Sequence, residues 1–338
     1  MRNTINRRHF IKTTAVASIG ISSLTSVVGQ DKKYRRIGVI GLDTSHSIEF
    51  SEIINDPNNV GDLEGFKVVA AYPYGSNDIE STAGRIPKNI EKVREMGIEV
   101  TDSIQALLEK VDFVLLETYD GRLHLEQALE VLKAGKPMFI DKPFAASLSD
   151  AIAIFRASDE YSVPVFSSSP LRYISNIQAT AKGETVGAVN GATAYSPALL
   201  EKSHPDLFWY GTHGVEILYT MMGTGCKSVI RTHTTDTDIV VGTWYDDRIG
   251  VFRGMRSGRR RYGGIAFGEK GISEVGGNEG YAPLVKMILQ FFRSLTPPVS
   301  PSETLEIYTF MEAADESKRR GGIAVNLEDV FREAGGIK

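Results

Sequence analysis

The segment Ala134–Phe144 constrains the fold of this chain more than any other stretch. Gly135 stands where a helix C-cap glycine is expected, and Pro137 prevents the helix from continuing. The apolar run Met138–Ile140 predicts a short strand that is covered on both faces. An acid, a lysine and a proline follow at the carboxyl end of this strand, so the segment predicts one unit of an α/β sheet.

The residues after this strand are Asp141, Lys142 and Pro143, and Pro143 fixes the direction of the exit. Ligands of open α/β sheets bind at the carboxyl ends of the strands. We therefore expect Lys142 to face a bound molecule. The alternative is an ion pair between Lys142 and Asp141 at the strand end.

Strand and helix patterns alternate through residues 34–170, which predicts a mostly parallel, doubly wound α/β sheet. The expected strands are Tyr34–Gly41, Phe66–Ala71, Ile98–Val100, Val111–Leu116, Met138–Ile140 and Val163–Phe166. The expected helices run from Ser45 or His46 to about Asn55, and over Lys88–Glu95, Ser103–Glu109, Leu125–Ala134 and Leu148–Tyr161.

Residues 171–338 are predicted to form a second, α+β domain. Apolar alternation indicates strands within 186–195, 229–245 and 249–255, with a turn at Gly263–Gly264. Amphipathic helices are expected at Tyr281–Leu295 and Ser302–Arg319.

Charge and cysteine content narrow the class of protein. The net charge is −4 and the isoelectric point is about 5.9, so no nucleic-acid partner is expected. The basic run Arg259–Arg261 is interpreted as a solvated hairpin tip. Cys226 is the single cysteine, which excludes an internal disulfide and a multi-cysteine metal site, and no metal site is predicted.

The first 29 residues are expected to be a targeting segment. Arg7 and Arg8 lie in a twin-arginine export pattern, ahead of a weakly apolar stretch from Thr14 to Gly29. That stretch is too short and too polar for a membrane span, so no membrane anchor is expected. These features predict export of the folded protein to the periplasm; the alternative is a basic, disordered tail.

The block from Val111 to Pro143 resembles the Gfo/Idh/MocA oxidoreductases. It has their strand, a turn ending in His124, a helix closing with Ala-Gly-Lys, a further strand and an acid-Lys-Pro turn. It departs from their pattern in having Asp141 instead of Glu, and Tyr119 where Pro is usual. The resemblance implies a Rossmann-like domain that binds NAD or NADP tightly. It also implies a second domain with an open, mostly antiparallel sheet, helices on one face, and a homo-oligomer built through that sheet.

The loop after the first strand carries an altered glycine motif. Gly41 keeps the first glycine of G-x-G-x-x-G, while Asp43 replaces the second and His46 the third. An acid at the second position adds bulk and negative charge where a pyrophosphate should approach the backbone. Thr44 and Ser45 still offer hydroxyl and amide groups to a phosphate at a helix start. The alternative role for Asp43 is to N-cap the helix.

The resemblance places further residues beside the cofactor. These are Thr118, His124, Asp141, Lys142 and Pro143. The tip of the second strand, residues 72–76, lacks the acid that would hold an adenosine ribose, so the choice between NAD and NADP stays open.

A second constellation lies at residues 204–216. In the family that the chain resembles, a helix start with Asp-x-x-x-His-x-x-Asp projects a histidine toward the substrate. Here His213 matches the histidine and Glu216 the final acid, whereas Trp209 replaces the first Asp. His204 or Asp206 is then the candidate to support the histidine.

Hydride transfer from a carbinol carbon requires a base for the hydroxyl proton and a group that stabilises the alkoxide. A histidine near neutral pKa and a strand-end lysine meet these needs, so Lys142 and His213 are the predicted catalytic pair. Substrate contacts are expected from Arg172, Tyr173, His204, Trp209 and Tyr210.

Three functions follow from these residues. The first is an exported NAD(P)-dependent oxidoreductase that acts on a sugar or polyol. The second is an enzyme of the same fold that cleaves glycosides through transient oxidation by bound NAD. The third, which Asp43 and His46 favour, is a non-catalytic sugar-binding protein on a degenerate Rossmann scaffold.

Overall fold

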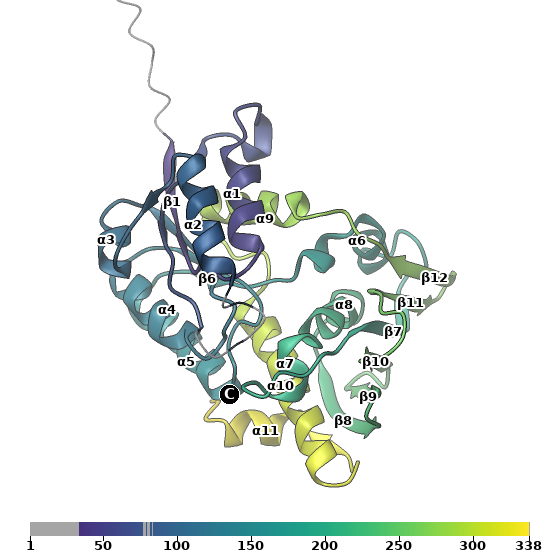
Figure 1. Ribbon diagram of the computed structural model, residues 1–338. Coiled ribbons are helices and arrows are strands. Elements are labelled where there is room, and N and C mark those ends of the chain that lie inside the picture. Colours follow the sequence, from purple (N-terminus) through teal and green to yellow (C-terminus); the bar gives the residue numbers. More distant parts are fainter. Residues whose placement is uncertain (1–33, 77–78, 80–81, 83, 338) are drawn as a thin grey trace, which may run out of the picture. The chain divides into compact units, whose positions relative to one another are not determined.

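The computed structural model describes residues 34–76, 79, 82 and 84–337 (Figure 1). The expected targeting segment lies outside the described residues. None of the helices in the described part of the chain is long and apolar enough to cross a membrane.

The first sheet is parallel throughout, with strand order β3-β2-β1-β4-β5-β6. This confirms the doubly wound, Rossmann-like sheet that the alternation predicts. Its strands are β1 Arg35–Ile40, β2 Phe66–Tyr72, β3 Glu99–Val100, β4 Phe113–Leu116, β5 Met138–Ile140 and β6 Val165–Phe166.

The three central strands end at one level. Ile40 of β1 pairs with Leu116 of β4, and Leu116 pairs with Ile140 of β5. The residues that follow these strands therefore lie side by side at the carboxyl edge of the sheet. This edge is also where the order of the strands changes direction, between β1 and β4.

Both faces of the first sheet are covered by helices. Successive side chains of a strand point to opposite faces and so join different apolar clusters. In β1, Ile37 and Val39 join an apolar cluster with α1 and α9, whereas Ile40 joins the cluster on the other face. The helices of this half are α1 His46–Asn55, α2 Arg85–Glu95, α3 Ile104–Leu108, α4 His124–Lys133 and α5 Leu148–Tyr161, with a 3₁₀ turn η1 at Gly61–Leu63. Helix α9 (Ala282–Ser294), from the C-terminal half of the chain, packs beside α1 on this sheet.

The second sheet has the order β12-β11-β7-β10-β9-β8-β13 and is antiparallel except for the β7–β10 pair. The predicted open, mostly antiparallel sheet is therefore confirmed. Its strands are β7 Val189–Pro197, β8 Cys226–His233, β9 Thr237–Trp244, β10 Ile249–Met255, β11 Gly263–Gly268, β12 Gly271–Gly276 and β13 Val325–Asn326.

Two expectations in this sheet are wrong. Gly263 and Gly264 do not form a turn but open strand β11, where a Cβ at Gly264 would lie 2.5 Å from the Thr193 carbonyl oxygen. Close backbone approach, not turn geometry, requires glycine there. Because β7 lies between β10 and β11, the exposed run Arg259–Arg261 crosses over β7 instead of forming a hairpin tip.

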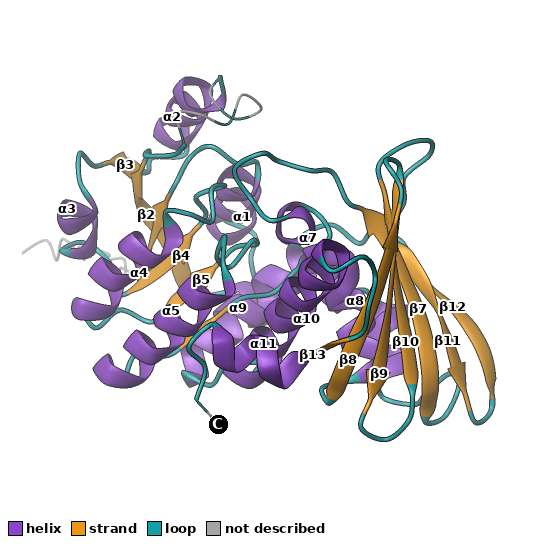
Figure 2. Cartoon of the chain, turned by 90° about the horizontal axis from the view of Figure 1, so that it is seen from below, coloured by secondary structure: helices purple, strands orange, loops and turns teal. Residues whose placement is uncertain are grey.

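Helices cover one face of the second sheet and leave the other face open (Figure 2). Helices α8 and α10 pack on β7 and β8. The open face carries exposed apolar side chains, namely Ile230, Ile249, Phe267 and Ile272. The helices of this half are α6 Ser175–Ala181, α7 Asp206–Trp209, α8 Thr212–Met222, α10 Pro301–Arg319 and α11 Leu327–Glu333, and a 3₁₀ turn η2 spans Pro170–Tyr173.

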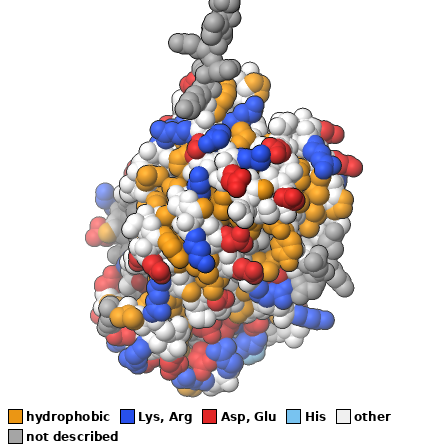
Figure 3. All heavy atoms as spheres, turned by 90° about the vertical axis from the view of Figure 1, so that its left-hand side faces the viewer, with side chains coloured by type: hydrophobic (Ala, Val, Ile, Leu, Met, Phe, Trp, Pro, Cys, Tyr) orange, Lys and Arg blue, Asp and Glu red, His pale blue; other side chains and the backbone are white. Residues whose placement is uncertain are grey.

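The surface on the side of α3, α4 and α5 carries Lys and Arg interspersed with Asp and Glu (Figure 3). Cys226 is buried, and burial raises the pKa of its thiol far above the ordinary value. Cys226 is therefore a small core residue.

Replacing Phe292 of α9 tests whether this late helix is part of the first core. Its ring stacks on Phe113 of β4 with centroids 4.6 Å apart, and it is 1% exposed. Phe292→Ala is expected to lower the free energy of unfolding by about 3–5 kcal/mol in urea denaturation. Val60→Ala, at a side chain that is 78% exposed, is the control and should change it by less than about 0.5 kcal/mol. Equal effects would show that α9 is not part of this core.

Candidate active site

A cleft of about 370 Å³ lies between the carboxyl edge of the first sheet and the start of α8. It is lined from both halves of the chain by Thr44, Ser45, His46, Arg85, Tyr119, Lys142, Pro170, Leu171, Ile174, Tyr210, His213, Tyr262, Gly277, Asn278, Glu279, Gly280 and Tyr281. Both predicted catalytic residues, Lys142 and His213, are in this lining.

Lys142 is held over an aromatic floor. It is 8% exposed, and its Nζ lies 5.2 Å from the ring centroid of Tyr119. Tyr119 in turn contacts Trp209 edge-on, and its hydroxyl donates to the Tyr210 hydroxyl at 3.4 Å. The cation–π contact attracts the ammonium group to a position inside the cleft. The aromatic residue that departs from the family pattern thus supports the lysine.

His213 lies in the first turn of α8 and is 7% exposed. Its Nδ1 lies 2.7 Å from Ser169 Oγ, which also accepts the Leu171 N–H. When Nδ1 donates to Ser169, Nε2 is left as a proton acceptor. Burial, and then the charge of Lys142, hold the pKa of His213 well below its ordinary value. The ring is therefore neutral at neutral pH, as a general base must be.

The supporting partner of His213 is Ser169, not either residue suggested by sequence. Asp206, the first residue of α7, accepts hydrogen bonds from Arg231 and Lys318 instead. His204 Nε2 lies 3.4 Å from Asp120, and burial lowers its pKa to about 4. Neither His204 nor Asp206 supports His213, so both expectations are wrong.

Glu216 of α8 binds the segment that connects the two sheets. Its carboxylate accepts from Ser168 Oγ at 2.6 Å, the Ser169 N–H at 2.8 Å and Arg172 Nε at 2.7 Å. Arg172 also donates to Glu303. Burial alone would lower the pKa of Arg172, but the two carboxylates outweigh it and raise the pKa. This network fixes Ser169 and hence the ring of His213.

Most of the predicted substrate residues lie behind the cleft. Arg172 is 8% exposed and held by two carboxylates, and Tyr173 packs against the core of the first sheet. Trp209 is 6% exposed and contacts the ring of His204 at 4.6 Å. Of this predicted set only Tyr210 lines the cleft. The others are positioning or packing residues here, because α7 turns Trp209 inward.

Gly41 is required by the turn at the end of β1. Its φ is +91°, and a Cβ would lie 2.4 Å from the Thr118 backbone nitrogen. Thr118 is fully buried. His124, also fully buried, lies with Nε2 2.6 Å from the Thr118 carbonyl and Nδ1 3.2 Å from the Phe144 carbonyl. His124 therefore holds two loops together and does not line the cleft, contrary to the expectation. Pro143 follows a cis peptide bond at Lys142.

Asp43 lies in the loop between β1 and α1, at the second glycine position of the motif. It is fully buried and accepts the Tyr119 N–H at 3.0 Å and the Ser76 N–H at 3.2 Å, which ties the loops after β4 and β2 together. It does not cap α1, so that alternative is wrong; the N-cap is Ser45, whose side chain makes no cap hydrogen bond. Burial raises the pKa of Asp43 to about 6.

Most of these residues fit a nicotinamide dinucleotide, but Asp43 does not. The start of α1 opens to the cleft with Ser45 exposed, which provides an anion site at a helix N-terminus. Lys142 and His213 face the same space. Asp43 opposes the approach of a pyrophosphate to the backbone, because its carboxylate fills the space that the second glycine of the motif would leave open.

Several lining residues were not predicted. Arg85, Tyr262 and Tyr281 come from segments that carried no motif. Glu117, which is outside this lining, had a usable signal because it directly follows a buried strand at the edge where ligands bind, whereas Ser169 comes three residues after β6.

The fold and the cleft together define a two-domain protein built on a dinucleotide-binding sheet. Residues 35–169 match the family model GFO_IDH_MocA, described as an oxidoreductase family with an NAD-binding Rossmann fold. This match identifies residues 35–169 as a domain of the Gfo/Idh/MocA oxidoreductase type, in agreement with the family resemblance, the enzyme class and the cofactor class that the sequence predicts.

Solved structures support the same fold over most of the chain. A probable dehydrogenase from Thermotoga maritima is 19% identical, with a TM-score of 0.71 over 87% of this chain and 99% of that one. Myo-inositol dehydrogenase from Lactobacillus casei, in complex with NAD(H) and myo-inositol, is 16% identical, with a TM-score of 0.68 over 87% and 96%. A putative myo-inositol dehydrogenase from Sinorhizobium meliloti 1021 is 14% identical, with a TM-score of 0.71 over 87% and 99%. Comparison with curated proteins gives no significant match.

The buried carboxylate of Asp43 should make stability depend on pH. Its folded pKa of about 6 exceeds the ordinary 3.8, so the folded state holds the proton and loses stability as pH rises through this window. Asp43→Asn removes that loss. The unfolding free energy of the variant relative to wild type should rise by about 3 kcal/mol from about pH 4 to about pH 7, measured in urea. A difference that stays flat, as expected for exposed Glu333→Gln, would contradict the assignment.

Proposed function

We propose that this protein oxidises a hydroxyl group of a sugar or polyol with a tightly bound NAD or NADP. The observation that carries the proposal is that Lys142 and His213 line the same cleft, at the carboxyl edge of the first sheet. The likeness of the fold to that of two inositol dehydrogenases supports the choice of a polyol. The polar lining, with Tyr210, Tyr262 and Asn278, offers hydroxyl and amide groups to such a substrate.

The chemistry divides between the cofactor and the chain. A bound nicotinamide would supply the acceptor for the hydride of the carbinol carbon. His213 Nε2 takes the hydroxyl proton, with Nδ1 anchored on Ser169. Lys142 stabilises the alkoxide that develops as the proton leaves. The low exposure of both side chains strengthens these interactions by excluding water.

The cofactor would be held by the start of α1, where Thr44 and Ser45 offer hydroxyl groups and the helix dipole favours the pyrophosphate. The ionised Asp43 weakens this hold by charge and by volume. Because an exported enzyme has no free nicotinamide pool, the cofactor is proposed to be acquired before twin-arginine export and recycled in the periplasm. Arg7 and Arg8 support this location.

One observation favours a second function, that of a sugar-binding protein without turnover. Asp43 fills the space where the second glycine of the motif would let a dinucleotide approach the backbone. Its carboxylate accepts hydrogen bonds from two backbone amides there. In that case the cleft holds a sugar and Lys142 and His213 serve only to bind it. Nucleotide content separates the two functions.

Lys142→Met tests the catalytic proposal. The purified full chain is mixed with a panel of sugars and polyols, and reduction of bound nicotinamide is followed by its absorbance. The variant should reduce the rate at least ~100-fold with unchanged nucleotide content, because the alkoxide loses its counter-charge. Lys110→Met is the control, since that lysine pairs with Glu99 on the surface. An unchanged rate in Lys142→Met would rule out its role.

The open face of the second sheet is proposed to form a homo-oligomer. Ile249 is 53% exposed there, among other apolar side chains. Ile249→Asp is expected to shift the assembly to a smaller species in size-exclusion chromatography with light scattering, because it buries an unpaired charge. Val60→Asp, on an exposed residue of the first half, should leave the mass unchanged. A wild-type monomer would contradict the proposal.

A further inference from the structure

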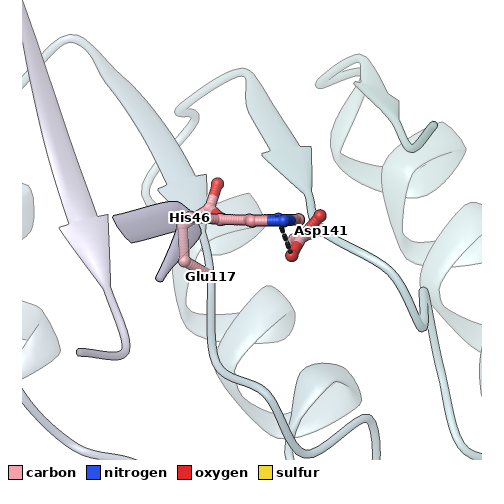
Figure 4. A group of neighbouring side chains, drawn as sticks. All are labelled: His46, Glu117 and Asp141. Atoms are coloured by element: carbon pink, nitrogen blue, oxygen red, sulfur yellow. Dashed lines mark hydrogen bonds and ion pairs between the residues drawn. The ribbon is translucent and has the colours of Figure 1, made fainter. Parts of the chain in front are cut away.

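Three ionisable side chains gather beneath the cleft at the level ends of the central strands (Figure 4). His46 comes from the first turn of α1, Glu117 follows β4 and Asp141 follows β5. They are 6%, 0% and 1% exposed, and their ligand atoms all lie within 4.8 Å of one another. His46 Nδ1 and Asp141 Oδ2 are 2.7 Å apart.

The carboxylates of this cluster are not satisfied by the protein. Both oxygens of Glu117 and Oδ1 of Asp141 are buried without a hydrogen-bond partner among the described residues. Buried charges are ordinarily paired or bound to a metal. His46 is paired with Asp141, and Lys142 supplies one positive charge nearby. The carboxyl group of Glu117 has no hydrogen-bond partner among the described residues, so it can take up either a cation or a proton.

We propose that His46, Glu117 and Asp141 bind a first-row divalent cation, with Zn²⁺ as the best match. One imidazole nitrogen and two carboxylates suit Zn²⁺ better than Mg²⁺, which prefers oxygen ligands and keeps its waters. Ligands of one Zn²⁺ lie roughly 3–3.5 Å apart. The His46–Asp141 pair is already close to that spacing, and the Glu117 oxygens need a shift on the order of 1 Å or so.

The site has an opening and a distinct origin in the sequence. His46 and Lys142 line the cleft, so an ion can enter from the same space that would hold a substrate. His46 stands at the third position of the glycine motif and Asp141 at the first position of the acid-Lys-Pro turn, both departures from the family pattern. The level strand ends bring these two departures into contact.

Protonation of Glu117 is the alternative to metal binding. Burial first, and Asp141 second, raise the pKa of Glu117 well above its ordinary value. A protonated Glu117 can donate to Asp141 and needs no metal. The two alternatives differ in a measurable way, because a metal that binds here releases the proton.

The test uses the purified full chain, stripped with a chelator and then titrated with Zn²⁺ alone. Metal content after dialysis should reach one Zn²⁺ per chain, with release of a proton seen as buffer-dependent heat in calorimetry. Zn²⁺ should also raise the melting temperature. Glu117→Gln keeps the shape of the side chain and should lower the affinity by more than ~100-fold.

Two further variants keep the test decisive. His46→Asn should lose binding, whereas His204→Asn should retain it, because His204 and Asp120 form a comparable but separate histidine–carboxylate pair at 3.4 Å. Folding of each variant is checked by circular dichroism. Absence of Zn²⁺ in the wild type, or equal binding in Glu117→Gln, would overturn the proposal. No substrate or nucleotide enters the assay, so its outcome is independent of the proposed oxidoreductase activity.

Discussion

Burial of charge at the carboxyl edge of the first sheet is the constraint on which this structure depends. Because β1, β4 and β5 end level, Asp43, Glu117 and Asp141 are forced into one low-dielectric region with Lys142 and His46. Each charge there must be hydrogen-bonded, paired or neutralised. The loops over the edge are arranged accordingly, since the Asp43 carboxylate organises backbone amides from two of them.

The second half of the chain completes the site through another buried charge. Glu216 on α8 gathers Ser168, Ser169 and Arg172 from the link between the two sheets. That network sets the position of Ser169 Oγ, which accepts the hydrogen bond from His213 Nδ1, so the position of the proposed base depends on the connection between domains. Hydride transfer tolerates little error in such positions, which gives the buried network a functional reason.

The sequence was sufficient for the first sheet and for the proposed catalytic pair. Period, caps and the Ala-Gly-Lys-Pro stop gave strand β5 and helix α5 with the observed bounds, and the strand-end rule placed Lys142 in the cleft. It was insufficient where long-range packing decides. Whether Arg172 faced a substrate depended on Glu303, more than a hundred residues away, and pairing of β11 with β7 overrode the turn signal of its glycines.

Asp43 is the residue at which the family pattern and this chain disagree most, so nucleotide content is the most direct measure of the proposed function. The full-length protein, expressed with its first 29 residues and purified, is denatured, and the released supernatant is assayed for NAD(H) and NADP(H) by mass spectrometry. The proposal predicts about one nucleotide per chain and identifies which of the two it is. If none is released and none binds on addition, hydride transfer is excluded and a sugar-binding role takes its place.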